Sequence, residues 1–392
     1  MVRDSFRFIL LEPSKVGPQH ITLLEGYLRA IVEMDIGSMG YRLVYRADPS
    51  SYAALSPEVK GRVPLEPIRV INPEERRWVC KVAQEVSAVF AAMHGMGPGD
   101  RLLITCLSSP SLLIVEAVAS FLGLGGRNVT VVLHGEVEAL FDNSCRSPRS
   151  WGFWSWRWSR LRKAGSPLSL AVIADFIRAG LAGLDPQRFG GDAIRVLPFP
   201  ITPFEGQTGR LPERHLAAFI GYRTRFKDFD RFQALAAAAG PDVRFAAIGG
   251  GAVDELGIGE RPFRPDLGFV GEVAEASVAI FPYSQGYTAA LSAAALDALS
   301  TGVHIVATRR PCFMALHAVF GPEHVTLFDT DAEVLALLAD RQRLDRLRAG
   351  AVARRAALAD SPFGLSATKE AFRTMLSPGS RPHLREPQKE GA

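Results

Sequence analysis

One stretch of the sequence constrains the fold more than any other, because it combines two buried strands and a small-residue helix. Residues 279–281 form an apolar run that Pro282 ends, since proline lacks the amide that a sheet ladder needs. An alanine-rich run at 290–301 predicts a helix, and Gly302 stands where helices favour a residue that tolerates positive φ. Residues 303–307 predict the next strand. Ligands of such parallel units bind at the loops that follow the strands.

The same alternation of apolar runs and helical patterns continues through the chain. Short apolar runs bounded by turn residues predict strands, and patterns with helical spacing, such as residues 111–122, lie between them. Strands are expected at residues 6–11, 41–45, 68–71, 102–107, 129–133, 170–174, 194–197, 216–220, 243–248, 277–281, 303–307 and 325–328. Strands that alternate with helices indicate parallel sheets, so we predict an α/β fold.

One connection departs from this pattern. Only about five residues separate the apolar residues 269–271 from the strand expected at 277–281. A parallel crossover needs roughly a dozen residues. We therefore expect the helix before this strand to be absent or reduced to a turn.

The composition limits the classes of protein to which the chain can belong. Its 392 residues, 47% of them hydrophobic, suffice for two or three domains of about 150 residues. A net charge of +4 is small for this length and does not indicate a nucleic-acid partner. The cysteines show no paired spacing, which argues against a zinc site or a disulfide framework; they are Cys80, Cys106, Cys145 and Cys312.

Neither a signal peptide nor a membrane-spanning helix is predicted. The apolar run at residues 6–11 is too short for a signal peptide, and an acid precedes it. The weakly charged run at 102–126 contains Pro110 and Glu116 and predicts a strand followed by a buried helix. We therefore expect a cytoplasmic protein.

The stretch at 281–308 resembles the donor-sugar segment of GT-B glycosyltransferases, in particular the retaining enzymes of glycosyltransferase family 4. The resemblance rests on Pro282, Tyr283, Ser292, residues 297–299, Gly302 and residues 305–307. It implies a GT-B fold, in which two Rossmann-like domains face each other across a cleft. It also implies a donor site that contains Tyr283, Ser292 and Asp297.

The helix of this segment differs from the family pattern at one position. Family members usually carry two Glu residues eight positions apart; Asp297 occupies the place of the second and Ala289 that of the first. The resemblance implies that Asp297 holds the donor's ribose hydroxyls, while no acid is present to touch the sugar. The alternative is a helix whose alanines only allow close packing on a sheet.

A second segment resembles the family's phosphate-binding segment. A glycine, three basic residues and aromatic neighbours follow the strand at 216–220 in the sequence GYRTRFKD. In the family an Arg and a Lys here hold the donor diphosphate, where negative charge grows as the glycosidic bond breaks. The resemblance assigns this catalytic role to Lys227 with either Arg223 or Arg225. The alternative is that all three are solvated loop charges.

Glycines follow the strand at 243–248 directly. Backbone amides at such a position can meet phosphate oxygens, and this is the family's second glycine-rich position. We therefore predict that three residues contribute to donor binding: Gly249, Gly250 and Gly251.

The loop after the first strand, residues 12–20, contains Lys15, Gly17 and His20. In GT-B enzymes this loop faces the cleft and helps to seat donor phosphates or acceptor. We include Gly17 in the predicted donor site. The alternative is an ordinary turn with a solvated lysine.

The strand expected at 129–133 runs into His134 and Gly135. A His-Gly or His-Asp pair is frequent at this place in family 4, where the imidazole lies beside the donor sugar. A neutral imidazole can hydrogen-bond a sugar hydroxyl, so we predict that His134 belongs to the catalytic site. Glu136 and Glu138 could each act as a base or only favour a helix N-terminus.

Four of the five tryptophans and four basic residues lie within residues 151–163. Tryptophan prefers membrane interfaces, and Lys and Arg attract anionic lipid. We predict a surface for membrane or acceptor docking that includes Trp151, Trp154, Trp156, Trp158 and Arg160. The alternatives are an amphipathic helix with buried tryptophans and a platform for a soluble sugar.

These features predict a domain order. We expect an N-terminal acceptor-side domain at 1–201, a linker at 202–214, a nucleotide-sugar-binding domain at 215–360, a crossover helix at 361–376 and a disordered tail at 377–392. The linker contains Pro, Gly and polar residues, and the tail contains three prolines.

The resemblance implies a hexosyltransferase that moves a sugar from a nucleotide-sugar donor to a glycan or a polyprenyl-linked or other lipid-linked acceptor, with retention of configuration. Such an enzyme would act in polysaccharide or glycolipid synthesis, at the inner face of the cell membrane. No metal or other cofactor is expected, because no carboxylate pair with metal-ligand spacing follows a strand. Two alternatives remain: an inactive relative that serves as a binding or assembly subunit, and a GT-B fold nucleotide-sugar epimerase.

Overall fold

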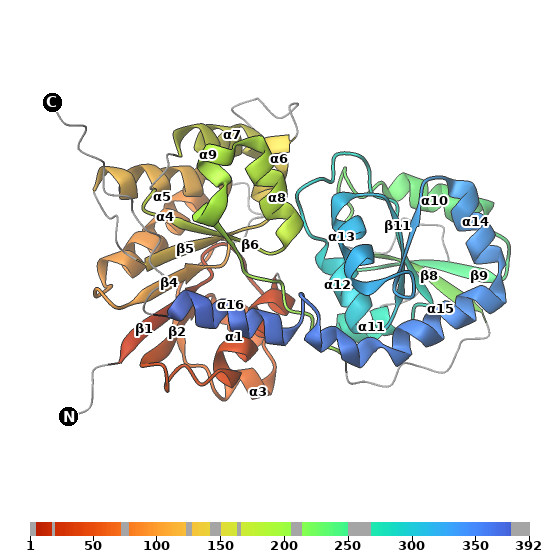
Figure 1. The fold of residues 1–392 in the computed structure, drawn as a ribbon, viewed down its shortest axis with the longest axis horizontal. Coiled ribbons are helices and arrows are strands. Elements are labelled where there is room, and N and C mark those ends of the chain that lie inside the picture. The colour runs from red at the N-terminus through yellow and green to blue at the C-terminus, as the bar shows by residue number, and fades with distance from the viewer. Residues whose placement is uncertain are drawn as a thin grey trace. The chain divides into compact units, whose positions relative to one another are not determined.

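A computed structural model describes residues 5–17, 20–71, 78–122, 128–141, 150–162, 166–204, 214–249 and 268–377. They form two compact units: the described residues of Met1–Pro200 and Ser366–Ala392, and those of Ile201–Leu365. Each unit is a parallel sheet with helices packed around it (Figure 1), which confirms the predicted α/β fold. Three parts of our predictions lie outside the described residues: Gly250 with Gly251, linker residues 205–213, and the tail from residue 378.

The first unit contains a seven-stranded sheet in the order β3-β2-β1-β4-β5-β6-β7. Its strands are β1 (Phe6–Leu11), β2 (Tyr41–Ala47), β3 (Leu65–Pro67), β4 (Arg101–Ile104), β5 (Asn128–Leu133), β6 (Ser169–Val172) and β7 (Ile194–Val196). Every pairing is parallel, and β1 lies between β2 and β4. The carboxyl ends of β1, β4 and β5 therefore meet at one edge of the sheet, where ligands of open α/β sheets bind.

The helices of the first unit are α1 (Ile21–Glu33), α2 (Pro49–Ala53), α3 (Pro57–Lys60), α4 (Trp78–His94), α5 (Ser109–Phe121), α6 (Glu138–Phe141), α7 (Trp151–Leu161), α8 (Asp175–Leu184), α9 (Pro186–Phe189) and α16 (Leu365–Leu376). Helix α16 packs into this unit through Phe372, which is fully buried. Its ring centroid lies 5.9 Å from that of Phe8 and 5.5 Å from that of Tyr27. The last described helix thus completes the core of the first unit.

The second unit contains a five-stranded parallel sheet in the order β12-β11-β10-β8-β9. Its strands are β8 (His215–Ile220), β9 (Val243–Ile248), β10 (Val278–Phe281), β11 (His304–Thr308) and β12 (Val325–Phe328), and its helices are α10 (Phe229–Ala238), α11 (Gly268–Ala274), α12 (Ala293–Ser300), α13 (Pro311–Phe320), α14 (Asp331–Ala339) and α15 (Arg341–Ala353). Phe219 and Phe232 are 0% exposed and anchor the core beside α10.

The stretch that most constrains the fold forms the predicted unit of strand, helix and strand. β10 and β11 pair in parallel, with Ile280 opposite Val306. The hydroxyl of Ser292 accepts the amide of Ala295 at 3.3 Å and begins α12. Gly302 has a φ of 73°, and a Cβ there would lie 2.9 Å from Cα of Val352. Gly302 therefore adopts the left-handed conformation that follows the end of α12, and its lack of a side chain lets the backbone of Val352 approach closely.

Two of the expected elements were wrong. Residues 269–271 belong to α11, so a helix does precede β10; we mistook a short helix, Gly268–Ala274, for apolar residues outside a helix. The third strand of the first sheet is Leu65–Pro67 and does not include residues 68–71. Only short apolar runs were available at both places, and a run of that length does not distinguish strand from helix or loop.

Candidate functional site

Lys227 lies close to the carboxyl end of β8 in the second unit. The chain leaves β8 at Gly221, whose φ of 92° favours glycine. A Cβ at Gly221 would lie 3.1 Å from Nζ of Lys227, so the absence of a side chain makes room for the ammonium group. Asp228 follows in the left-handed region and begins α10, with its side chain accepting the Arg231 amide at 3.3 Å.

The surroundings of Lys227 destabilise its charged form and leave its ammonium group able to interact with an anion. Burial lowers the pKa of Lys227 to about 8, and the charge of Asp297 opposes that shift. The Nζ atom lies 5.6 Å from the centroid of the Tyr283 ring, within the range of a cation–π contact. Asp297 is 6% exposed on α12. A partly desolvated cation of this kind interacts strongly with an anion that replaces water around it.

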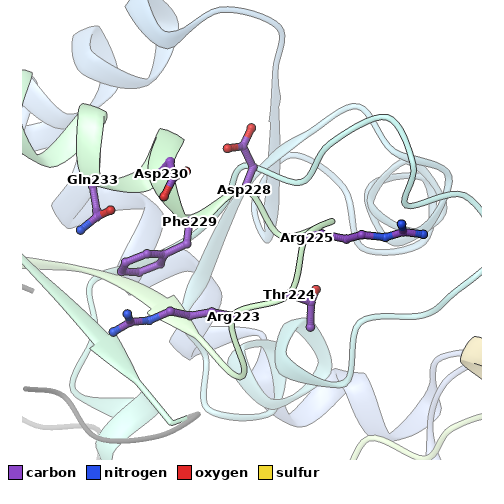
Figure 2. A pocket seen from close by; sticks show the side chains of 7 residues that line it. All are labelled: Arg223, Thr224, Arg225, Asp228, Phe229, Asp230 and Gln233. Atoms are coloured by element: carbon purple, nitrogen blue, oxygen red, sulfur yellow. The ribbon is translucent and has the colours of Figure 1, made fainter. Parts of the chain in front are cut away.

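Arg223 and Arg225 lie over aromatic rings. The guanidinium carbon of Arg223 is 4.2 Å from the ring centroid of Phe229, and that of Arg225 is 4.3 Å from the ring centroid of Phe226. Figure 2 shows that the Arg225 side chain points away from the pair of Arg223 and Phe229. A pocket of about 430 Å³ is lined by Arg223, Thr224, Arg225, Asp228, Phe229, Asp230 and Gln233.

Tyr283 and Ser292, which are predicted to bind the donor, lie against each other in the structure. Both side chains are buried, with exposures of 0% and 2%, and the Tyr283 hydroxyl lies 3.1 Å from Oγ of Ser292. Each side chain therefore has a hydrogen-bond partner within the fold, and Ser292 also begins α12, while direct donor binding by these two residues stays a prediction. The ring of Tyr283 also lies beside Lys227.

Two of the glycines predicted to bind the donor lie in the described part of the chain, and their backbone conformations account for the choice of glycine. Gly249 has a φ of 78°, and a Cβ there would lie 2.7 Å from the Phe269 ring. Gly17 has a φ of 57°, and its amide donates to Oγ of Ser50 at 2.9 Å. Its predicted contact with the donor remains a prediction.

In the first unit, a buried carboxylate lies where the ends of β1 and β4 meet. Glu12 is 0% exposed and accepts the amides of Ser14 and Lys15 at 3.0 and 3.1 Å. The Thr105 hydroxyl donates to its other oxygen at 2.8 Å. Burial alone would raise the pKa of Glu12, but His20 and these hydrogen bonds hold it below its ordinary value.

Two imidazoles lie beside this carboxylate. The ring centroids of His20 and His134 are 5.0 Å apart, and Nδ1 of His20 is 3.9 Å from Oε2 of Glu12. Nε2 of His134 lies 2.7 Å from the carbonyl oxygen of Thr105, which can only accept, so this nitrogen carries the proton. Burial, and then the charge of His20, lower the pKa of His134 to about 3. His134 is therefore neutral, as predicted for a sugar contact.

The side chain of Glu136 forms a hydrogen bond with the start of the loop after β5. Its Oε2 accepts the His134 amide at 2.8 Å, and the Cys106 thiol lies 3.5 Å from its Oε1. Glu138 is 7% exposed. Sequence reasoning did not select Glu12, although an acid directly after a buried central strand is the signal that could have identified it.

The tryptophan-rich helix α7 is partly buried against α5. Trp158 is 1% exposed, packs on Phe189 at 5.9 Å, and its Nε1 lies 3.4 Å from Oε2 of Glu116. Its predicted place on the docking surface is therefore wrong. Trp154 and Trp156 are partly exposed, and the exposed Arg160 lies 5.8 Å from the Trp156 ring. The Trp151 side chain lies outside the described residues.

Two features are absent from the described residues. No helix within them has the length and apolar character needed to cross a membrane. Over the same ranges, no three residues among His, Cys, Asp and Glu are grouped so that they could hold a metal ion.

The protein has the GT-B fold of several solved glycosyltransferases. Anabaena Alr3699/HepE in complex with UDP-glucose superposes with a TM-score of 0.61 at 14% identity, covering 94% of this chain and 99% of that one. WaaG, a glycosyltransferase involved in lipopolysaccharide biosynthesis, gives 0.59 at 11% identity, with 95% and 100% covered. Sucrose-phosphate synthase from Thermosynechococcus elongatus gives 0.61 at 14% identity, with 94% and 97% covered. No protein-family model and no curated protein matches the sequence.

Proposed function

We propose that the protein is a glycosyltransferase that moves a hexosyl group from a nucleotide sugar. The observation that carries the proposal is the partly desolvated ammonium of Lys227 at the carboxyl end of β8 in a GT-B fold. Departure of a nucleoside diphosphate leaves negative charge that a fixed cation stabilises. Solved structures with this fold include complexes of Alr3699/HepE with UDP-glucose and with UDP and glucose.

In this proposal Lys227 contacts the diphosphate and Asp297 keeps the lysine charged until the donor binds. Asp297 also contacts the ribose hydroxyls, as the resemblance to family 4 implies. Arg223 and Arg225 lie on the same loop, and either supplies further positive charge. The unprotonated Nδ1 of His134 accepts a hydrogen bond from a sugar hydroxyl. No metal is required, because the cations take over its electrostatic role.

The configuration of the product distinguishes two versions of this reaction. The resemblance to family 4 implies retention, and the helix lacks the first of the two acids usual there. Ala289 occupies that position and is 2% exposed. Retention is therefore the version that the resemblance implies, and inversion is the alternative that the missing acid leaves open.

Nucleotide release tests the proposal. The purified protein is incubated with UDP-glucose or GDP-mannose, with and without polyprenyl phosphate, and free UDP or GDP is measured. We expect release above the rate without protein. Binding of a nucleotide sugar without release would favour the inactive binding subunit, and conversion of the sugar without release would favour an epimerase.

We also propose that the acceptor is a lipid-linked glycan reached at the inner face of a membrane. Partly exposed Trp154 and Trp156, with the exposed Arg157 and Arg160, give α7 the aromatic and basic character that suits an anionic lipid surface. This surface is smaller than predicted because Trp158 is buried.

Vesicle binding checks this surface. A basic residue near an anionic membrane contributes about 1 kcal/mol, so Arg157→Ala/Arg160→Ala should weaken binding to phosphatidylglycerol vesicles by about 30-fold. The matched control is Arg341→Ala/Arg343→Ala, which removes two exposed arginines from the second unit. Equal binding by the two double variants would contradict docking through α7.

A further inference from the structure

The outer surface of helices α4 and α5 is mostly apolar. Both helices, like α7, connect strands in the same direction along the first sheet, so all three cover one face of that sheet, and α5 packs between α4 and α7 (Figure 1). What we call the α4–α5 face consists of the exposed positions Trp78, Val79, Cys80, Ala83, Ser87, Ala91, His94, Ile114, Ala117, Ser120, Phe121 and Leu122. None of these described positions carries an acid, a lysine or an arginine.

The charged side chains of α4 and α5 are directed into the protein. The two helices contain Lys81, Glu85 and Glu116, and all three are buried. Lys81 pairs with Glu85, and Glu116 pairs with Arg162, just after α7, at 3.0 Å. An ordinary surface helix has the reverse pattern, with charged residues toward solvent and apolar residues toward the core. An exposed apolar surface of this kind marks a site of interaction.

The α4–α5 face is large enough for a stable protein contact. Helix α4 has 17 residues and α5 has 13. With a rise of about 1.5 Å per residue and about 10 Å between packed helices, their outline covers roughly 450 Å². Large side chains stand out from this outline, since Phe121 is 89% exposed and Val79 is 61% exposed. A stable contact takes about 800 Å² of accessible surface from each partner, which such a relief supplies when it interdigitates with another.

The distribution of charge favours a second copy of this chain as the occupant of the face. In a two-fold contact the same surface meets itself, so a charge on it would come close to a like charge. The described positions of the α4–α5 face bring no acid, lysine or arginine together in this way. Helices that lie in a lipid interface carry lysine and arginine beside their apolar side chains. Here the exposed Arg157 and Arg160 belong to α7, outside the face.

The spacing of the exposed side chains suits the packing of one helix against another. On α4, Ala83, Ser87 and Ala91 recur every four positions and give that helix a row of small side chains. On α5, Ile114 and Phe121 lie about two turns apart and form a row of large ones. Packed helices place the raised rows of one against the low rows of the other. We propose that the protein forms a two-fold dimer in which the large side chains of α5 in each copy pack on the small side chains of α4 in the other.

Sedimentation equilibrium of the full chain tests the dimer. We expect a mass of twice 42.6 kDa at micromolar concentration. Ala117→Arg places a charge at an exposed position between Ile114 and Phe121, and the fold should survive because arginine and alanine have similar helix propensities. Like charges in the contact should weaken association by about 100-fold. Ala179→Arg, at an exposed position of α8 in the same unit, is the matched control and should dimerise like wild type.

The thiol of Cys80 gives a second and local measurement. Cys80 is exposed on the face, whereas Cys106 and Cys312 are buried. Alkylation of Cys80 by iodoacetamide, located by mass spectrometry, should slow as the concentration of wild type rises. In Ala117→Arg the rate should stay constant. A rate that stays constant in a dimeric wild type would overturn the inference, because the contact would then lie elsewhere.

Two further results would contradict the dimer. One is a wild type that keeps the mass of a single chain at about 100 µM, where a contact with a micromolar dissociation constant would be nearly complete. The other is association of Ala117→Arg equal to that of Ala179→Arg. A monomeric wild type that binds phosphatidylcholine vesicles, with binding lost in Phe121→Asp, would assign the face to lipid instead.

Discussion

Replacing Lys227 by methionine is expected to weaken UDP binding by about 10- to 100-fold. A hydrogen bond to a charged group contributes about 1.5–3 kcal/mol, and this ammonium is partly desolvated already. Methionine keeps the length of the side chain beside Tyr283 and Gly221 without the charge. Titration calorimetry at pH 7 measures the loss. Arg244→Met is the matched control, since Arg244 is an exposed residue of β9 in the same unit.

The pH dependence of binding is part of the same prediction. Burial lowers the pKa of Lys227 to about 8, so the free protein loses this charge as the pH rises through 8. Wild-type affinity for UDP should therefore fall between pH 7 and pH 9, while that of Lys227→Met should change little. Equal slopes for the two proteins would show that Lys227 does not contact the diphosphate.

The stability of the ligand-free protein should rise with pH, whereas the affinity for UDP should fall. The folded pKa of Lys227 lies below its ordinary value of 10.5, so its charge costs stability below pH 8, and this cost disappears as the pH rises from 8 to 10.5. Lys227→Met should consequently raise the melting temperature of the free protein at pH 7. Scanning calorimetry measures this change.

Glu85→Ala is expected to destabilise the first unit by about 3–5 kcal/mol, the usual result of breaking a buried ion pair. Glu85 is 0% exposed, and Nζ of Lys81 lies 3.0 Å from its Oε1. The hydroxyls of Ser14, Ser108 and Ser111 also donate to it. Removing the carboxylate leaves the buried ammonium of Lys81 with one hydrogen bond among the described residues, to the Ser14 carbonyl at 2.6 Å.

Urea unfolding followed by tryptophan fluorescence measures this loss selectively. All five tryptophans lie between residues 78 and 158, so their emission reports the first unit. The double variant Lys81→Met/Glu85→Ala is the control, because it removes both charges and should recover part of the stability. A double variant less stable than Glu85→Ala would show that the uncompensated Lys81 charge is not the cause.

Local patterns were sufficient to predict most of the fold. The strands β1, β9 and β12 occur at the predicted residues, because each is a continuous apolar run between turn residues. Gly302 ended its helix as expected. Short elements such as α11 and β3 could not be predicted, since a few apolar residues fit a helix, a strand or a loop equally well.

The site was less predictable because it depends on contacts between distant segments. Lys81 and Glu85 have the spacing of an ordinary pair on a solvated helix face, and only the loops after β1 and β4 make them buried. The burial of Trp158 against Phe189 is equally non-local. Lys227 was selected from its segment alone and its role stays a prediction, whereas the proximity of Glu12 to His20 could be seen only in the structure.

Binding of a nucleotide to the protein tests the central claim most directly. The protein is titrated with UDP, GDP, UDP-glucose and GDP-mannose while its unfolding is followed by scanning calorimetry. A ligand at ten times its dissociation constant should raise the free energy of unfolding by about 1.4 kcal/mol. The proposal predicts such a shift with the nucleotides of one base, and its loss in Lys227→Met. No shift with any of the four, or an equal shift in the variant, would contradict it.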